Sequence, residues 1–356
     1  MATVFDMARL NASDYQFVHQ ASQGVLYDAV KRYLAMANQD RLDAFSFFVS
    51  GATTKFKERV YLPMEGYMQR RAVGTKGDAV KRKGSYDVAY PIYDFTDELA
   101  LTEVDAGYMT PEEFQAHLDG ILTRAANTYR LEILTRIFKN TNTVHDDDRN
   151  GELTVVPLAN TDGTIYPPFP GTVTGTDDES YFESSYTAAN ISDTNNPYST
   201  LSSELLGRFG SGTGGGGVAT LINKAQVAVT EALTNFVPVT PSAISAGNDT
   251  DTVGVPAGIP GKIIGYLDDT YVSVYDFIPA NYMAAIHMGT ERPLIERNDP
   301  PETGLGGGLR LKASGNEWPI MYQDWSWRFG LGTRNRLNGA VMELGTGGTY
   351  TIPTLI

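Results

Sequence analysis

A short basic segment interrupts an acidic chain, and its pattern predicts two strands with no third strand beside them. Between residues 55 and 93 there are nine basic and four acidic residues, whereas the net charge of the 356-residue chain is −14. Residues 55–62 and 85–95 are rich in β-branched and aromatic side chains, which is typical of strands. Residues 70–84 combine basic side chains with three glycines and predict a flexible tip. We therefore expect a long two-stranded arm.

The arm is expected to dock on a second copy of the chain. An isolated two-stranded ribbon is marginally stable in water because it has nothing against which to bury one face. Residues 141–305 hold 21 acidic and 6 basic residues, so arm and body carry opposite charges that favour association. The candidate contact residues are the basic side chains of the arm: Lys55, Lys57, Arg59, Arg70, Arg71, Lys76, Lys81, Arg82 and Lys83.

Composition excludes several classes of protein. The chain has no cysteine, which excludes disulfides, a thiol nucleophile and thiolate metal sites. Its negative charge argues against wrapping nucleic acid, because phosphates must be met by surplus Lys and Arg. The N-terminus lacks the basic start and apolar run of a signal peptide, and no apolar stretch reaches about 18 residues. We therefore expect no secretion signal and no membrane span.

The strongest helix signal begins at Thr110. Thr110, Pro111 and Glu113 supply a hydroxyl N-cap, a proline in the first turn and a glutamate three residues after the cap, which together predict a capping box. Apolar residues then recur at spacings of three and four as far as Ile137. The predicted helix covers residues 110–140 and is about 45 Å long at about 1.5 Å per residue. The apolar positions do not keep a strict heptad, which excludes a coiled coil.

The remaining elements are predicted from the same periodicities. Helices are expected over residues 23–37, 218–236 and 279–288. A strand or an anchor before the arm is expected over residues 45–49. Strands are expected over residues 262–278, 318–331 and 334–344, and a turn-rich acidic excursion over residues 141–197.

One turn resembles the start of a calcium-binding loop. Asp146, Asp148 and Asn150, followed by Gly151, match its first oxygen ligands and its glycine. The closing position, which should be a bidentate glutamate, is Pro157. An acidic Asn-Gly turn is therefore favoured over a calcium site.

The tryptophans near the C-terminus predict a core strand. Trp325, Trp327 and Phe329 alternate with polar residues, which is typical of a half-buried strand and favours core over a stacking platform for sugars.

The glycine run at 210–217 lacks the Lys-Ser or Lys-Thr of a phosphate loop, so a hinge or flexible loop is favoured there. No hydrolase or kinase motif occurs, and we expect neither an enzyme nor a cofactor.

The order of these parts resembles the major capsid protein of tailed double-stranded DNA phages, which has the Hong Kong 97-like fold. That α+β fold consists of an N-terminal arm, an extended hairpin called the E-loop, a peripheral domain with a long spine helix, and an axial domain. The resemblance assigns residues 1–50 to the N-terminal arm, 51–95 to the E-loop, 96–197 and 306–356 to the peripheral domain with spine helix 110–140, and 198–305 to the axial domain. The strand at 334–344 looks like the closing strand of the peripheral sheet.

The resemblance implies a non-enzymatic subunit that self-assembles into the pentamers and hexamers of an icosahedral shell. The shell would enclose double-stranded DNA without reading its sequence, in a virion made in the host cytoplasm. It also implies a portal and a separate scaffolding protein, since this chain shows no helical scaffolding region, and it allows a cement or decoration protein. Two alternatives remain: an encapsulin-like shell around protein cargo, and a β-rich carbohydrate-binding protein that uses the aromatic strand from Trp318 to Phe329.

Overall fold

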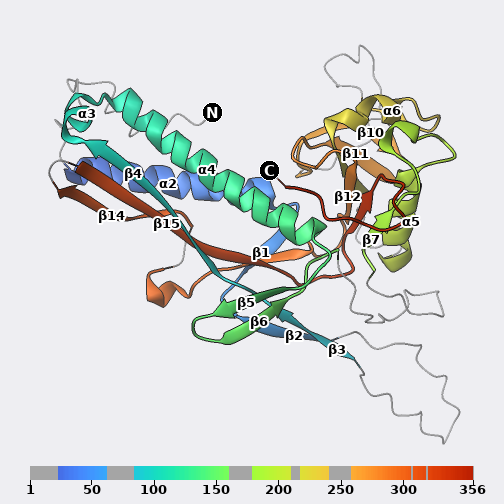
Figure 1. Cartoon of the computed structure of the whole chain (residues 1–356), viewed down its shortest axis with the longest axis horizontal. Helices are drawn as coiled ribbons and strands as arrows, with labels where there is room; N and C mark the ends of the chain where they lie inside the picture. The colour runs from blue at the N-terminus through green and yellow to red at the C-terminus, as the bar shows by residue number, and fades with distance from the viewer. Residues whose placement is uncertain are drawn as a thin grey trace, which may run out of the picture.

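Two β-sheets and one long helix that reaches from one to the other organise the chain (Figure 1). The computed structural model describes residues 23–61, 84–159, 179–209, 217–239, 258–305, 308–317 and 320–355. Helices and strands both contribute to it, as the expected α+β class requires. Within these ranges no helix combines the length and apolarity needed to cross a bilayer.

The first sheet has five strands and is built around β15 (Ile320–Thr333). β15 pairs antiparallel with three strands: β4 (Tyr93–Thr102), β14 (Arg310–Glu317) and β13 (Leu294–Arg297). β1 (Val49–Thr53) adds a parallel strand next to β13. The predicted aromatic strand at 318–331 is therefore confirmed in the part of it that the structure describes.

Two helices lie along this sheet, α2 (Gln23–Phe45) and α4 (Pro111–Phe138) (Figure 1). The predicted helix at 23–37 is thus confirmed and extends eight residues further. Phe47 and Phe48 follow it and are buried, so this short run anchors the chain before β1 begins.

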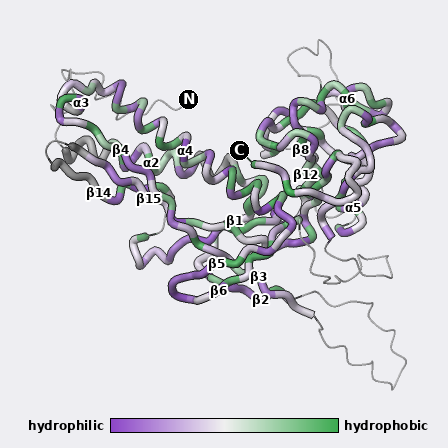
Figure 2. The backbone as a smooth tube through the Cα atoms, viewed as in Figure 1, coloured by the Kyte–Doolittle hydropathy of each residue, from purple (hydrophilic) through white to green (hydrophobic). Residues whose placement is uncertain are grey.

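Helix α4 is the predicted long helix, and it begins as its sequence requires. The Thr110 side chain accepts a hydrogen bond from the Glu113 N–H, and the Glu113 carboxylate accepts one from the Thr110 N–H, at 3.3 and 2.9 Å. Hydrophobic and hydrophilic segments alternate along the helix (Figure 2), as expected of a helix with one buried face. At its far end Phe138 packs against Tyr282 of the second sheet, with ring centroids 5.9 Å apart. The hydrophobic core around α4 therefore includes residues of both sheets.

Replacing Thr110 by alanine tests the contribution of this cap. The N-terminal N–H groups of a helix lack partners within the helix, so the variant should lose about 1 kcal/mol of the free energy of unfolding. Thr123 lies mid-helix and is exposed, with its hydroxyl bonded only to the Asp119 carbonyl. Thr123→Ala should therefore leave stability nearly unchanged in the same denaturant titration. Equal losses in the two variants would contradict a specific role for the capping box.

The second sheet has seven strands. In spatial order they are β7 (Tyr181–Glu183), β16 (Ala340–Glu343), β12 (Tyr282–His287), β8 (Val218–Ile222), β11 (Thr270–Val274), β10 (Lys262–Leu267) and β9 (Val237–Pro238). α5 (Pro197–Phe209) packs on it through Leu201 and Leu205. The hairpin of β10 and β11 confirms the strands predicted within residues 262–278.

Short elements complete the fold. They are α3 (Glu103–Tyr108), α6 (Val227–Glu231), the hairpin of β5 (Thr143–Asp147) and β6 (Gly151–Val155), and the 3₁₀ turns Ala188–Asn190, Lys224–Gln226 and Pro301–Thr303. The hairpin and the 3₁₀ turn at Ala188–Asn190 agree with the turn-rich excursion predicted over residues 141–197.

Two predicted helices are wrong. The segment 218–236 begins with β8, and only Val227–Glu231 within it is α-helical. The segment 279–288 contains β12 instead of a helix. Every residue of β8 and of β12 is buried, because both strands lie inside the seven-stranded sheet. A strand buried on both faces has a continuous apolar run without alternation, and such a run cannot be told from a buried helix by periodicity.

Three strands cross the predicted limits between the peripheral and axial domains. β13 lies within residues 198–305 but belongs to the five-stranded sheet, whereas β7 lies within residues 96–197 and β16 within residues 306–356 but both belong to the seven-stranded sheet. The expectation that residues 334–344 close the sheet of the preceding long strand is therefore wrong. The physical reason is that β16 pairs with β12 and β7, and its buried Val341 and Met342 complete the core of that second sheet.

Candidate assembly interface

The root of the predicted arm is a two-stranded hairpin that projects from the body (Figure 1). β2 (Lys57–Tyr61) pairs antiparallel with β3 (Ser85–Ala89), with Arg59 opposite Asp87. The arm prediction is confirmed for this root. The second strand is shorter than predicted, because β3 ends at Ala89 and the chain enters the five-stranded sheet as β4.

The basic side chains of the root already have acidic partners within the hairpin. Lys57 and Arg59 both form ion pairs with Asp87, at 2.9 and 2.8 Å, and Lys55 pairs with Glu58 at 3.3 Å. Hydrogen bonds from Arg59 and then from Lys57 hold the pKa of Asp87 well below its ordinary value. These three bases therefore contribute little surplus charge to a partner.

The other six candidate contact residues lie outside the described residues. In sequence they stand in the segment 62–83 with only two acids, so this segment carries the basic excess of the arm. These residues are Arg70, Arg71, Lys76, Lys81, Arg82 and Lys83.

One face of the root is buried against the body. Val60 and Tyr86 face each other across the hairpin and pack with Val88, Tyr90 and Ile295, the last of which comes from β13. The expectation of a ribbon with nothing to bury against is therefore wrong for the root. This packing fixes the position from which the rest of the arm departs.

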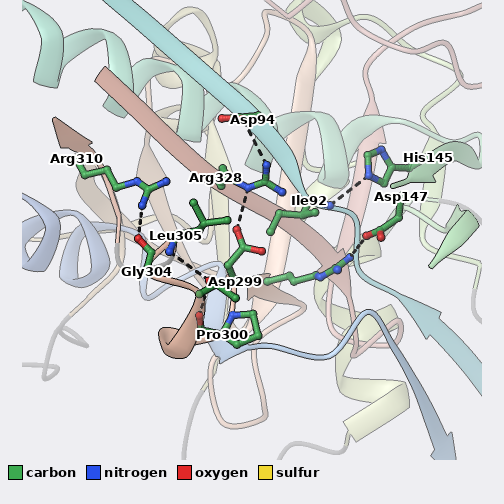
Figure 3. Close-up of polar contacts among 12 residues, drawn as sticks. Ile92, Asp94, His145, Asp147, Asp299, Pro300, Gly304, Leu305, Arg310 and Arg328 are labelled. Carbon is green, nitrogen blue, oxygen red and sulfur yellow. Dashed lines mark hydrogen bonds and ion pairs between the residues drawn. The ribbon is translucent and has the colours of Figure 1, made fainter. Parts of the chain in front are cut away.

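A buried ion pair holds the chain where the arm joins the body. The Arg297 guanidinium donates to the Tyr90 carbonyl and to the Asp147 carboxylate, both at 2.7 Å, and both charged side chains are buried. Beside them His145 Nε2 accepts from the Ile92 N–H at 3.5 Å (Figure 3). Burial lowers the pKa of His145, so that the ring is neutral near pH 7 and able to accept this bond. The junction thus ties β13, the β5–β6 hairpin and the arm together.

Two glycines of β15 let the junction lie directly on the sheet. A Cβ at Gly330 would stand 2.1 Å from the Pro91 carbonyl oxygen, and one at Gly332 would stand 2.4 Å from the Tyr90 ring. Side chains at these positions would push the arm away from the sheet.

Acid should loosen this junction. Burial of Asp147 opposes its charge, but hydrogen bonds from Arg297, the Arg149 backbone and Asn150 outweigh it and lower the pKa of Asp147 to about 2. Because the folded pKa lies below the ordinary value near 4, ionised Asp147 stabilises the fold. That contribution is complete above about pH 4–5 and is lost as the pH falls towards 2. Unfolding titrations at pH 5 and pH 2.5 should show a smaller pH dependence in Asp147→Asn than in the natural chain, and equal pH dependences would contradict this assignment.

A second, more exposed ion pair lies on the five-stranded sheet near the junction. Arg328 donates to Asp299 at 2.9 Å and to Asp94 at 3.3 Å (Figure 3). Arg328 therefore joins β15 and β4 to the turn after β13. Its substitution is a suitable control for substitution of the arginines that contact the arm.

The candidate calcium ligands lie at the turn of the β5–β6 hairpin. Asp146, Asp148 and Asn150 are all exposed, whereas Asp147 between them points inward to Arg297. Asn150 donates its side-chain amide to Asp147 at 2.8 Å, and Gly151 has a φ of +73°. Across the described ranges no group of three or more His, Asp or Glu side chains is placed to hold a metal ion. The predicted Asn-Gly turn is present as the turn between β5 and β6.

The aromatic strand is core. Trp325 and Trp327 are 1% and 2% exposed, and Phe329 is fully buried. Trp327 stacks on Tyr129 of α4, with ring centroids 5.4 Å apart. The hypothesis that these side chains form an exposed platform for sugars is therefore wrong for the two described tryptophans, because both are buried in the core; Trp318 lies outside the described residues.

A hollow of about 460 Å³ lies between α2 and α4, and the charged side chains that line it, Asp119 and Arg130, are held by hydrogen bonds. Its Asp119 accepts a hydrogen bond from Tyr33, and its Arg130 donates to Tyr275 and to Asn127. These polar groups bind one another across elements, which is a structural role.

Comparison with known proteins places the fold. No protein-family model matches this sequence, and neither does any curated protein. A solved structure from Mycobacterium phage Patience superposes with a TM-score of 0.67 at 19% identity, over 94% of this chain and 92% of its own. The capsid structure of the cyanophage P-SCSP1u superposes with a TM-score of 0.51 at 9% identity, over 85% of this chain and 88% of its own. This chain has the fold of bacteriophage capsid proteins. At these identities the likeness lies in the fold, and it covers at least 85% of each chain.

Sequence reasoning missed the residues that anchor the arm in this capsid-type fold. Arg297 and Asp147 are 150 positions apart, and each follows an ordinary strand pattern. Gly330 and Gly332 alternate within β15, and such a spacing in a strand is a signal for close backbone approach that could have been used.

Proposed function

We propose that this chain is the structural subunit of an icosahedral capsid of a tailed double-stranded DNA phage. The observation that carries the proposal is the likeness in fold to the cyanophage capsid structure, over 85% of this chain, together with the likeness to the structure from Mycobacterium phage Patience, over 94% of it. An arm anchored at its root and projecting from the body suits a subunit that completes its surface only with copies of itself. Head-to-tail contacts of this kind close into rings, and we infer pentamers and hexamers from them.

We assign the parts by the Hong Kong 97-like scheme. Residues 1–50 are the N-terminal arm, 51–95 the E-loop, 96–197 and 306–356 the peripheral domain, and 198–305 the axial domain. α4 is the spine helix. Sheet membership moves three strands across these limits: β13 goes with the peripheral part, and β7 and β16 go with the axial part.

A role as a capsid subunit determines which molecules the chain must contact. The shell encloses double-stranded DNA without reading its sequence, and the acidity of the chain suits a container that must not bind packed phosphates tightly. We infer a separate scaffolding protein and a portal, with room for a cement or decoration protein, in a virion whose subunits are made in the host cytoplasm. The role requires neither catalysis nor a cofactor.

Size-exclusion chromatography followed by negative-stain imaging of the purified chain tests the proposal. We expect closed hollow particles of uniform size, with or without co-expressed scaffold. A monomer that forms no particles under either condition would contradict the proposal. Analysis of particles from infected cells separates the two kinds of shell, since double-stranded DNA inside supports the phage capsid and a protein cargo supports the encapsulin-like alternative.

A further inference from the structure

The segment that crosses from one sheet to the other, residues 334–338, contacts parts of the molecule far apart in sequence. It follows β15 of the five-stranded sheet and leads through Gly339 into β16 of the seven-stranded sheet. Within this crossover segment Arg336 is 3% exposed and Asn338 is fully buried. Its position is therefore fixed by surroundings on both sides.

On one side the crossover segment binds the arm root. Tyr86 of β3 donates its hydroxyl to the Arg334 carbonyl at 2.7 Å. Arg336 donates to the Asp87 carbonyl at 3.2 Å, and its guanidinium lies 4.7 Å from the centre of the Tyr86 ring. Arg334 also forms an ion pair with Glu58 of β2 at 3.4 Å. Both strands of the arm root are thus held by this one segment.

On the other side the same segment is hydrogen-bonded into the seven-stranded sheet. The Asn338 side chain accepts from the His287 N–H at 2.8 Å and donates to the His287 carbonyl at 3.0 Å, so it pairs with the end of β12 as a neighbouring strand would. The Leu337 carbonyl accepts from Arg208 of α5 at 3.2 Å. A shift of the crossover segment must therefore move or strain the end of β12.

Arg334 connects the two sides directly. Besides Glu58 of the arm, its guanidinium forms an ion pair with Glu291, in the loop that leaves β12. Asn335 and Asn338 both donate to the Glu291 carbonyl, at 2.9 and 2.7 Å. The loop at Glu291 and the arm root therefore share one arginine and one backbone segment.

We propose that the crossover segment couples the arm to the seven-stranded sheet, so that displacement of the arm root by a partner changes the packing of β12 and of the loop at Glu291. Closely packed, hydrogen-bonded segments shift as units because the interior leaves no free space to absorb the movement. By linkage, a change in the seven-stranded sheet then alters the affinity of the arm for its partner by the same factor. The coupling is a property of the single chain and holds whether or not the chain forms shells.

Hydrogen–deuterium exchange of the full-length chain, with all variants compared in the same oligomeric form, tests the coupling. Tyr86→Phe removes the hydroxyl that binds Arg334 and keeps the ring beneath Arg336. We expect exchange in residues 282–291 to rise about fivefold, which is the size of effect that one lost hydrogen bond produces. Unchanged exchange in residues 282–291, whether or not the arm root itself exchanges faster, would overturn the proposal.

Two controls separate coupling from general loosening. Tyr266→Phe removes a hydroxyl that donates to Asp269 within the seven-stranded sheet and should leave residues 282–291 unchanged. Arg334→Gln should raise exchange both in residues 85–89 and in residues 282–291, whereas Arg328→Gln, which also breaks an arginine bridge between two acids, should raise neither. Equal effects of Arg334→Gln and Arg328→Gln would likewise overturn the proposal.

Discussion

Glutamate in place of Arg70, Arg71, Lys81, Arg82 and Lys83 should abolish shell assembly and leave the monomer folded. The three bases at the arm root pair with two acids of the hairpin, so most of the basic excess that attracts a second, acidic copy lies in the tip. Reversal turns this attraction into repulsion. Size-exclusion chromatography should show loss of the particle peak, with circular dichroism and the thermal midpoint of the monomer unchanged.

A matched control carries the same change in net charge on the body. Lys31, Arg149, Lys224, Lys262 and Lys312 are exposed and lie outside the arm. Their reversal to glutamate should reduce assembly far less. Normal particles from the tip variant, or equal loss in both variants, would show that the charge of the arm does not direct assembly.

Arg297→Met should have the largest effect on stability of any single change considered, a loss of about 3–5 kcal/mol. The variant leaves the buried Asp147 carboxylate without its cation and the Tyr90 carbonyl without its donor. Urea titration of the monomer measures the change in the free energy of unfolding. The arm root should also become more susceptible to limited proteolysis, because the guanidinium holds the chain at the point where the arm joins the body.

Two further variants show whether the loss in Arg297→Met comes from breaking the buried ion pair with Asp147. Arg124→Met breaks an ion pair of similar length with Asp97, 2.8 Å, but the arginine side chain is 62% exposed, so the loss should be small. Adding Asp147→Asn to Arg297→Met should recover part of the loss, since the double variant no longer buries an Asp147 carboxylate without its cation. A loss in Arg297→Met no greater than in Arg124→Met would mean that the junction is not held by this pair.

Local signals accounted for the elements that were predicted correctly. α4 carries its own start signal in Thr110 and Glu113, and its apolar positions repeat over 28 residues, so few alternatives fit. The arm root was recognisable because β-branched and aromatic residues flank a glycine-containing basic tip. The aromatic strand alternated clearly enough to separate core from surface.

The errors come from information that lies outside each segment. The sequence predicts helices at β8 and β12 because a strand buried on both faces lacks alternation, and only the neighbouring strands reveal its type. β16 was placed in the wrong sheet because strand pairing is decided by distant partners, here β12 and β7. The pairing of Arg297 with Asp147, across 150 positions, likewise depends on the fold and leaves no local pattern.

Photo-crosslinking from the arm tip tests the central claim, that the arm completes a second copy, most directly. The chain has no cysteine, so a single cysteine at Thr75 can be labelled with a benzophenone probe without side reactions. Irradiation of the assembled protein should give covalent dimers and larger multimers, with the probe attached to the acidic surface of a different chain. Crosslinks found only within single chains, on protein that remains monomeric at high concentration, would contradict the account.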